Sequence, residues 1–325
     1  MQRFSPRIGG LVTFTVVLAT DGSAQAKVAR DLVIGLALPE GATLRVVSVL
    51  GTTPTLAGLT ESMREQLIAV AIAALERELA EFAAPLERPG LRVERAVLEG
   101  RTAAAIVDDA ISAHADLVVV GSHGRGALGS LLLGSVSAEL VDRAPCPVFV
   151  ARGRALDRVI LAEDGSTNAR RACDLIARWE IFRGVAVRIV SVARVAPYFH
   201  SGIAPSEQAV AREALVAAAA ATRKKHELLA RQSARRLARA GRRSEAEVRV
   251  GIPTAELVAA AREWSADLVI VGSRGRTRLA RLLLGSVARG VLLHAPCSVL
   301  VVPRAAVRAA NGAPIRDPHH ALVPA

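Results

Sequence analysis

One glycine-rich pattern, G-x2-G-x9-G-S, occurs twice in the chain with identical spacing. The two copies consist of Gly121, Gly124, Gly134 and Ser135, and of Gly272, Gly275, Gly285 and Ser286. Glycine adopts positive φ and lets backbone N–H groups approach a phosphate closely. The closing Gly-Ser stands where a helix is expected to begin, and the first N–H groups of a helix attract anions. The repeated pattern therefore predicts two sites for the phosphates of a nucleotide.

The same residues also fit a purely structural interpretation. A tight turn from strand to helix would need the glycines for its backbone and would use Ser135 or Ser286 as an ordinary N-cap. Recurrence favours phosphate binding, because chance would have to produce the same loop twice. The pattern is neither a Walker A loop nor the dinucleotide fingerprint, since no Gly-Lys-Ser/Thr follows and the loop comes after a late strand. No residue is predicted to be catalytic or to bind a metal, because no matching Ser/His/Asp or Cys/His arrangement accompanies the loops.

A second repeated feature, Asp-Gly-Ser, follows the first apolar run of each half, at Asp21 and Asp164. In parallel α/β sheets, ligands bind at the carboxyl ends of the strands. Both Asp-Gly-Ser and the glycine loops come just after predicted strands, so we expect them to meet at that edge. Each aspartate could instead cap the following helix, although a cap and a ligand contact can coexist.

The two halves differ beside these residues. Thr20 precedes Asp21, whereas Glu163 precedes Asp164. A carboxylate at this place would repel phosphates or accept a hydrogen bond from a ribose, depending on its direction. The second loop is also richer in arginine, with Arg274, Arg276 and Arg278 against Arg125 in the first. Guanidinium groups suit phosphates, but these could equally be solvated surface residues.

The chain is a two-copy repeat of 325 residues, a natural length for two domains. An offset of 151 residues relates Gly100 to Gly251 and Gly121 to Gly272, whereas 143 separate the two Asp-Gly-Ser segments. The second half therefore carries 8 extra residues, which lie between its second strand and Gly251. We predict domains over 11–152 and 157–304, a linker over 152–157 and a mobile tail over 305–325.

Short runs rich in β-branched residues alternate with longer helical segments. Strands are predicted over 12–19, 43–50, 91–98, 117–120 and 148–151, and near 157–163, 185–192, 245–250, 268–271 and 298–302. Helices are predicted over 24–37, 60–85, 102–113 and 135–142, with the same order in the second half. The runs at 117–120 and 268–271 are apolar throughout, which is typical of central parallel strands. The pattern predicts an α/β fold of two tandem Rossmann-like, doubly wound domains, each with a five-stranded parallel sheet flanked by helices.

Basic residues are in excess, with a formal net charge of +12. Segment 212–243 holds ten Lys and Arg residues against two Glu, and Arg231, Arg235 and Arg239 share one face of its predicted helix. Such a stripe could bind nucleic acid, an anionic membrane or an acidic partner, or could be an ordinary solvated face. No aromatic residues are interleaved with it, which argues against binding of single-stranded nucleic acid.

The N-terminal segment imitates a secretory signal peptide, with an apolar run over 8–19 followed by Ala24-Gln25-Ala26. The repeat argues against this interpretation, because the same strand and Asp-Gly-Ser recur at 159–166, where no signal peptide could stand. No uninterrupted apolar stretch reaches the ~18–20 residues that a membrane span needs. The odd count of three cysteines argues against a disulfide framework. We therefore predict a cytoplasmic protein.

Taken together, these residues resemble the universal stress protein family, over roughly 11–152 and 157–304. The loop pattern matches the ATP-binding branch of that family. The resemblance implies a stress-response regulatory protein with two pseudo-equivalent adenine-nucleotide sites and slow hydrolysis at most. ATP is the expected ligand, with Mg²⁺ as a possible companion and AMP, ADP or a cyclic nucleotide as alternatives. A nucleotide-independent module that binds through segment 212–243 is the competing hypothesis.

The resemblance also implies roles for individual residues. Asp21 and Asp164 would contact the adenine-ribose part of the nucleotide, and the backbone of Val49 and Val192 would contact adenine. The phosphates would lie on Gly121, Gly124, Gly134 and Ser135 in the first half, and on Gly272, Gly275, Gly285 and Ser286 in the second. The last strands, 147–151 and 298–302, would pair with each other, within one molecule or in a larger homodimer.

Overall fold

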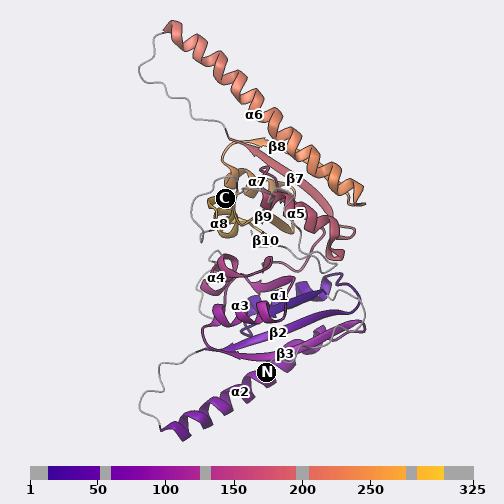
Figure 1. Cartoon of the computed structure of the whole chain (residues 1–325), viewed down its shortest axis with the longest axis vertical. Coiled ribbons are helices and arrows are strands. Elements are labelled where there is room, and N and C mark those ends of the chain that lie inside the picture. The colour runs from indigo at the N-terminus through magenta and orange to yellow at the C-terminus, as the bar shows by residue number, and fades with distance from the viewer. Residues whose placement is uncertain (1–13, 52–59, 125–132, 195–204, 276–283, 304–325) are drawn as a thin grey trace, which may run out of the picture.

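The strands form one ten-stranded sheet in the order β3-β2-β1-β4-β5-β10-β9-β6-β7-β8 (Figure 1). The computed structural model describes residues 14–51, 60–124, 133–194, 205–275 and 284–303, with only the backbone for 205–214. The first half contributes β1 (Thr15–Ala19), β2 (Ala42–Leu50), β3 (Leu91–Glu99), β4 (Leu117–Gly121) and β5 (Val148–Ala151). The second half contributes β6 (Arg158–Ala162), β7 (Ala186–Ala193), β8 (Ser244–Val250), β9 (Leu268–Gly272) and β10 (Ser298–Val302).

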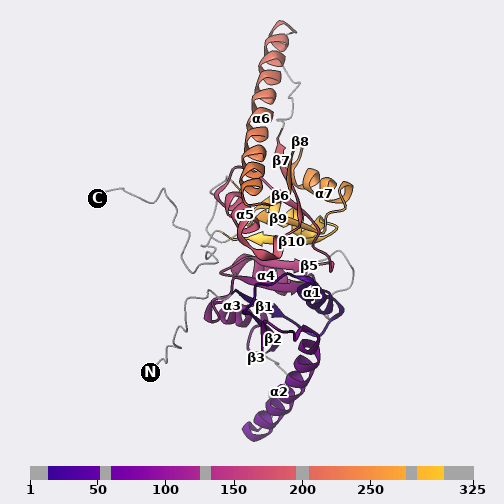
Figure 2. The ribbon, with the colours of Figure 1, turned by 90° about the vertical axis from the view of Figure 1, so that its right-hand side faces the viewer.

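Helices cover both faces of the sheet (Figures 1 and 2). One face carries α1 (Ala24–Gly35), α2 (Glu61–Ala83), α5 (Thr167–Arg178) and α6 (Pro205–Arg239), together with the short 3-10 helices η2 (Ala84–Leu86) and η3 (Glu180–Phe182). The other face carries α3 (Thr102–Ser112), α4 (Ser135–Arg143), α7 (Pro253–Glu263) and α8 (Ser286–His294). Each layer packs on one cluster of buried apolar side chains that runs through both halves.

The predicted fold class is confirmed. Within each half all strand pairs are parallel, and the central strands β4 and β9 are almost entirely buried, as their apolar sequences indicated. The strand predicted over 12–19 is observed from Thr15, and residues 11–13 lie outside the described part of the chain. The tail predicted over 305–325 also lies outside it. No helix within the described ranges is both long and apolar enough to cross a bilayer.

The two halves are joined by their last strands. β5 and β10 pair in antiparallel orientation, with Phe149 opposite Leu300. The segment 152–157 that follows β5 is held against the second half, because the Arg152 N–H donates to Ser298 Oγ over 3.1 Å and its guanidinium donates to Cys297 O over 3.3 Å. The predicted pairing of 147–151 with 298–302 is therefore made within a single chain.

The extra residues of the second half extend one helix. α6 has 35 residues, whereas α2, which occupies the corresponding place in the first half, has 23. Figure 1 shows both helices continuing past the sheet at their N-terminal ends. The two helices bury matching positions near their C-termini, Leu79 and Phe82 in α2 and Ala230 and Ser233 in α6. An offset of 151 residues therefore aligns this part of α6 with α2.

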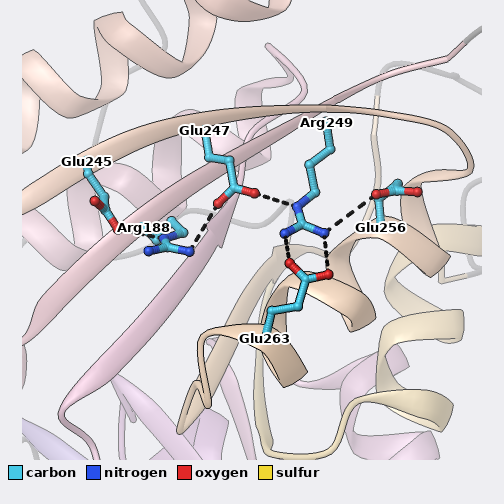
Figure 3. A network of polar contacts seen from close by, with 6 residues as sticks. All are labelled: Arg188, Glu245, Glu247, Arg249, Glu256 and Glu263. Carbon is cyan, nitrogen blue, oxygen red and sulfur yellow. Dashed lines mark hydrogen bonds and ion pairs between the residues drawn. The ribbon is translucent and has the colours of Figure 1, made fainter.

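A chain of alternating charges fastens α7 to the outer strand β8 (Figure 3). Its members are Arg188 on β7, Glu245, Glu247 and Arg249 on β8, and Glu256 and Glu263 on α7. Arg249 is the centre, since its Nε lies 2.5 Å from Glu247 Oε1 and its Nη1 lies 3.2 Å from Glu263 Oε1. The Arg188 guanidinium also lies 4.5 Å from the ring centre of Trp264, just after α7.

Replacing Arg249 by methionine is expected to lower the free energy of unfolding by about 1–2 kcal/mol, because three carboxylates would then face one another without their shared cation. The hydrogen bond from Arg249 holds the pKa of Glu263 below its usual range. A lowered carboxyl pKa stabilises the fold above about pH 4, and this contribution is lost as the pH falls through the lowered value. Urea unfolding at several pH values should show the difference between wild type and R249M shrinking in acid.

The matched control is R92Q on the opposite edge strand, β3. Arg92 is 75% exposed and forms one ion pair, 3.0 Å from Glu94. An exposed pair of this kind is worth about 0.5 kcal/mol or less, so R92Q should unfold almost like wild type. Equal effects of the two substitutions would contradict a structural role for the Arg249 network.

Candidate functional site

All six residues predicted for the first site line one cavity. It has a volume of about 390 Å³ and lies beyond the carboxyl ends of β1, β2 and β4, beside the start of α4. Its lining includes the predicted residues Asp21, Val49, Gly121, Gly124, Gly134 and Ser135. Thr20 and Ser23, which flank Asp21 and Gly22, also line it, as do Thr102, Ile106 and His123, which sequence analysis did not single out.

The six predicted residues of the second half likewise line one cavity. Its volume is about 670 Å³, and its lining includes Asp164, Val192, Gly272, Gly275, Gly285 and Ser286. Topology explains the match, because the same parallel strand order in each half brings the same strand ends together. The two cavities are therefore equivalent in position but not in size.

The aspartates and the second glycines of the loops lie in close contact. A Cβ atom built on Gly124 would be 2.5 Å from Asp21 Oδ2, and one built on Gly275 would be 2.6 Å from Asp164 Oδ2. No side chain other than hydrogen fits at that distance unless the aspartate moves. The other oxygen of Asp21, Oδ1, accepts the Ser23 N–H over 3.0 Å, and Asp164 Oδ1 accepts the Ser166 N–H over 2.9 Å.

The helix caps differ from the expectation. Neither aspartate caps a helix, because Ser23 Oγ accepts the Ala26 N–H and Ser166 Oγ accepts the Ala169 N–H, so the serines cap α1 and α5. Ser135 and Ser286 are also not N-caps. They are the first residues of α4 and α8, and the caps are Gly134 and Gly285, which make no side-chain cap bond.

The far end of each loop is tied to its beginning by one backbone hydrogen bond. The Gly134 N–H donates to Ser122 O, and the Gly285 N–H donates to Ser273 O, each over 2.8 Å. This bond places the N-terminus of α4 or α8 beside the end of β4 or β9. The first N–H groups of both helices therefore adjoin the cavity, where they have no carbonyl partner within their own helix.

The Glu163 side chain contacts α6 and also makes the hydrogen bond that Thr20 makes in the first half. Thr20 Oγ1 accepts the Gly22 N–H over 3.0 Å, and Glu163 Oε1 accepts the equivalent Gly165 N–H over 2.7 Å. Its second oxygen, Oε2, accepts a hydrogen bond from Ser233 on α6. Glu163 is only 3% exposed, and this burial raises the pKa of its carboxyl group. Both oxygens are thus engaged by protein donors, although the residue also lines the cavity.

A buried serine–histidine pair forms part of the second cavity. Ser191 Oγ donates to Glu163 O over 2.6 Å and lies 2.7 Å from His226 Nδ1. A hydroxyl has one proton, so Nδ1 of His226 carries a hydrogen and donates it to the serine. His226 and Thr222 of α6 line this cavity, together with Arg194. Sequence analysis missed these residues. The signal in the sequence was His226, a polar residue on the face of α6 that is buried against the sheet.

Of the arginines expected near the loops, the structure describes one, Arg274. Arg274 lines the second cavity. Arg125, Arg276 and Arg278 lie outside the described residues. Among the residues that the structure does describe, no cluster of three or more His, Cys, Asp or Glu side chains could hold a metal ion.

Comparison with known proteins identifies relatives of both halves. The model of the universal stress protein family matches residues 13–152 and 155–303. A universal stress protein of Thermus aquaticus is 40% identical over 138 residues, which is 42% of this chain and 98% of that protein. One of Mycobacterium tuberculosis is 34% identical over 200 residues, which is 59% of this chain and 63% of that protein.

A solved structure shows the same fold over nearly the whole chain. The crystal structure of a universal stress protein from Archaeoglobus fulgidus superimposes with a TM-score of 0.59 at 21% sequence identity. The match covers 89% of this chain and 98% of that one.

Replacing Glu163 tests its role as a link to α6. E163A should lower the free energy of unfolding by about 1–3 kcal/mol, because it leaves the partly buried Gly165 N–H and the buried Ser233 hydroxyl without their acceptor. E163Q can accept from Gly165 and still bond to Ser233, so it should be at least as stable as wild type at neutral pH. Urea unfolding measures both, and an E163A protein as stable as wild type would contradict the assignment.

The two variants should also differ in pH dependence. A buried carboxyl with a raised pKa binds its proton more tightly in the folded state than in the unfolded state. The stability of wild type should therefore fall as the pH rises from about 4 through the raised pKa, and E163Q should lack this fall. Unfolding curves recorded between about pH 4 and about pH 8 test the sign.

Proposed function

Because this chain belongs to the universal stress protein family, we propose that it binds adenine nucleotides at both cavities and acts as a regulatory protein in the stress response. The observation that carries the proposal is the convergence of all six predicted residues of each half on one cavity. The two sites are pseudo-equivalent, and ATP is the proposed ligand. AMP, ADP or a cyclic nucleotide would use the same adenosine contacts.

Different groups of each cavity suit different parts of the nucleotide. Backbone N–H groups at the start of α4 and α8 suit phosphate oxygens, because a helix N-terminus is electropositive. The carboxylates of Asp21 and Asp164 suit ribose hydroxyls, which donate hydrogen bonds to them. The strand ends at Val49 and Val192 offer backbone groups to a base. Mg²⁺ would be held chiefly by the phosphates themselves.

Binding without fast turnover is the proposed mode of action. The carboxyl group beside Asp164, that of Glu163, is held by Ser233 and Gly165, so it does not serve as a general base for an attacking water. Hydrolysis should be slow at most. A regulatory protein works through the difference in its conformation or partners between the free and bound states, which requires differential affinity rather than catalysis.

Titration calorimetry with ATP should find two equivalents bound per chain. D21N keeps an oxygen for the Ser23 N–H but loses the charge, and should weaken the first site by about tenfold or more while sparing the second. D164N should do the reverse. The D21N/D164N double variant should bind neither equivalent of ATP tightly. Mass spectrometry of small molecules released from gently purified protein identifies the natural ligand.

D142N is the matched control, because Asp142 is an exposed aspartate on α4 and does not line the cavity. It should bind like wild type. Absence of binding of ATP, ADP, AMP and cyclic nucleotides to folded wild-type protein would refute the proposal. Full binding by the double variant would refute the residue assignment.

A further inference from the structure

The basic segment of the second half does not form a uniform charged face. Arg223 pairs with Glu227 on the same helix, 3.4 Å away, and Arg242 donates to Ala177 O and Trp179 O, which ties the end of α6 to the end of α5. The remaining arginines separate by position. Arg235, Arg236 and Arg239 line a groove between α5 and α6, whereas Arg231 does not.

Four arginines line this groove, since Arg170 of α5 joins the three from α6. The groove has a volume of about 450 Å³, and Gln232 and Glu163 are also part of its lining. Such a volume is within the usual range for small-molecule sites, roughly 300–1,000 Å³. Guanidinium groups present planar forks of N–H donors that match phosphate oxygens.

Two of the four arginines are fixed in place by the protein. Arg170 donates to Gly165 O over 2.8 Å and to Thr167 Oγ1 over 3.2 Å, and Arg236 forms an ion pair with Asp174 of α5. The carboxyl group of Glu163 is engaged by Ser233 and Gly165. These contacts fix the walls of the groove but leave most of the positive charge of its arginines without an ion-pair partner among the described residues.

The other two arginines, Arg235 and Arg239, differ from Arg170 and Arg236. Within the described part of the chain, neither Arg235 nor Arg239 takes part in an ion pair. They stand four residues apart on one helix, a spacing at which like charges repel and destabilise the helix. The only carboxylate bound to this set of four is Asp174, as far as the described residues extend. An anion in the groove would relieve that repulsion.

The first half matches this arrangement only in part. With the alignment of α6 on α2, Ala84 and Pro85 occupy the places of Arg235 and Arg236, and Glu81 occupies that of Gln232, whereas Arg88 occupies that of Arg239. Lys27 corresponds to Arg170 at the offset of the Asp-Gly-Ser segments. Arg235 and Arg236 therefore distinguish the second half from the first.

We propose that the groove between α5 and α6 is a binding site for a small phosphate-bearing anion. Its bounded volume and its four lining arginines favour a compact ligand over a long polyanion. Among its described lining residues none is aromatic and able to stack on a base, which disfavours single-stranded nucleic acid. The groove adjoins the proposed nucleotide site at Glu163, which lines both, but Arg235 and Arg239 line the groove and not the nucleotide cavity.

Calorimetric titration of the full chain with inorganic pyrophosphate tests the proposal. R235Q/R239Q should weaken pyrophosphate binding by about tenfold or more, because each charge-assisted hydrogen bond is lost. The matched control is R223Q/R231Q, which removes the same charge from the same helix outside the groove, and its affinity should stay within about twofold of wild type. Glutamine is a good helix former, so both variants should fold, as thermal melting will show.

Identical pyrophosphate isotherms for wild type and R235Q/R239Q would overturn the proposal, as would equal weakening by both double variants, which would indicate diffuse charge. Tight binding of a single-stranded RNA oligonucleotide that both pairs weaken equally would also overturn it, in favour of an extended polyanion surface. ATP affinity should be the same in all three proteins, so loss of the groove and failure of the nucleotide sites give different results.

Discussion

The pairing of β5 with β10 is the interaction on which the joint architecture depends. It unites two parallel sheets in antiparallel fashion through a short ladder with Phe149 opposite Leu300. Because strand side chains alternate between faces, this ladder sends Phe149 and Leu300 into one core cluster and Val150 and Val299 into the other. Both cores therefore continue across the junction. An edge-to-face contact between Phe14 and Trp179, 5.0 Å between ring centres, adds a direct link between the halves.

The second half preserves the cavity of the first but supports it differently. Where the first half buries Phe82, the second buries Ser233, and the partner of that serine is Glu163 in place of Thr20. A buried carboxyl group is tolerated only when its oxygens are hydrogen-bonded, and here both are. The polar link joins α6 to the end of β6, and His226 of the same helix, which contacts Ser191, forms part of the cavity wall. Divergence between the copies thus changed the wall of the cavity, while the three glycines and the final serine of the loop pattern stayed the same.

Sequence analysis predicted the fold class and the meeting of the Asp-Gly-Ser segments with the glycine loops, because repeated spacing and apolar strands such as 117–120 fix which strand ends must meet. It could not predict the direction of a side chain. Glu163 lay beside the site in sequence, and only packing against α6 shows that its carboxyl group is engaged elsewhere. Helix periodicity placed Arg235 and Arg239 on one face, but only the tertiary structure shows that Arg170 lines the same groove. The alternative in which Ser135 caps its helix was wrong by one residue, because Gly134 is the N-cap and makes no side-chain bond.

The junction leaves β3 and β8 as the two outer strands of the sheet. Unpaired backbone groups on such strands can recruit another chain and start edge-to-edge aggregation. Here both edges carry charges, among them Arg92 and Glu94 on β3 and Glu245 and Glu247 on β8. A strand added at either end would have to pack against these charges and strip them of water. The ion pairs that fasten the outer strands therefore also disfavour the addition of a further strand at either end of the ten-stranded sheet.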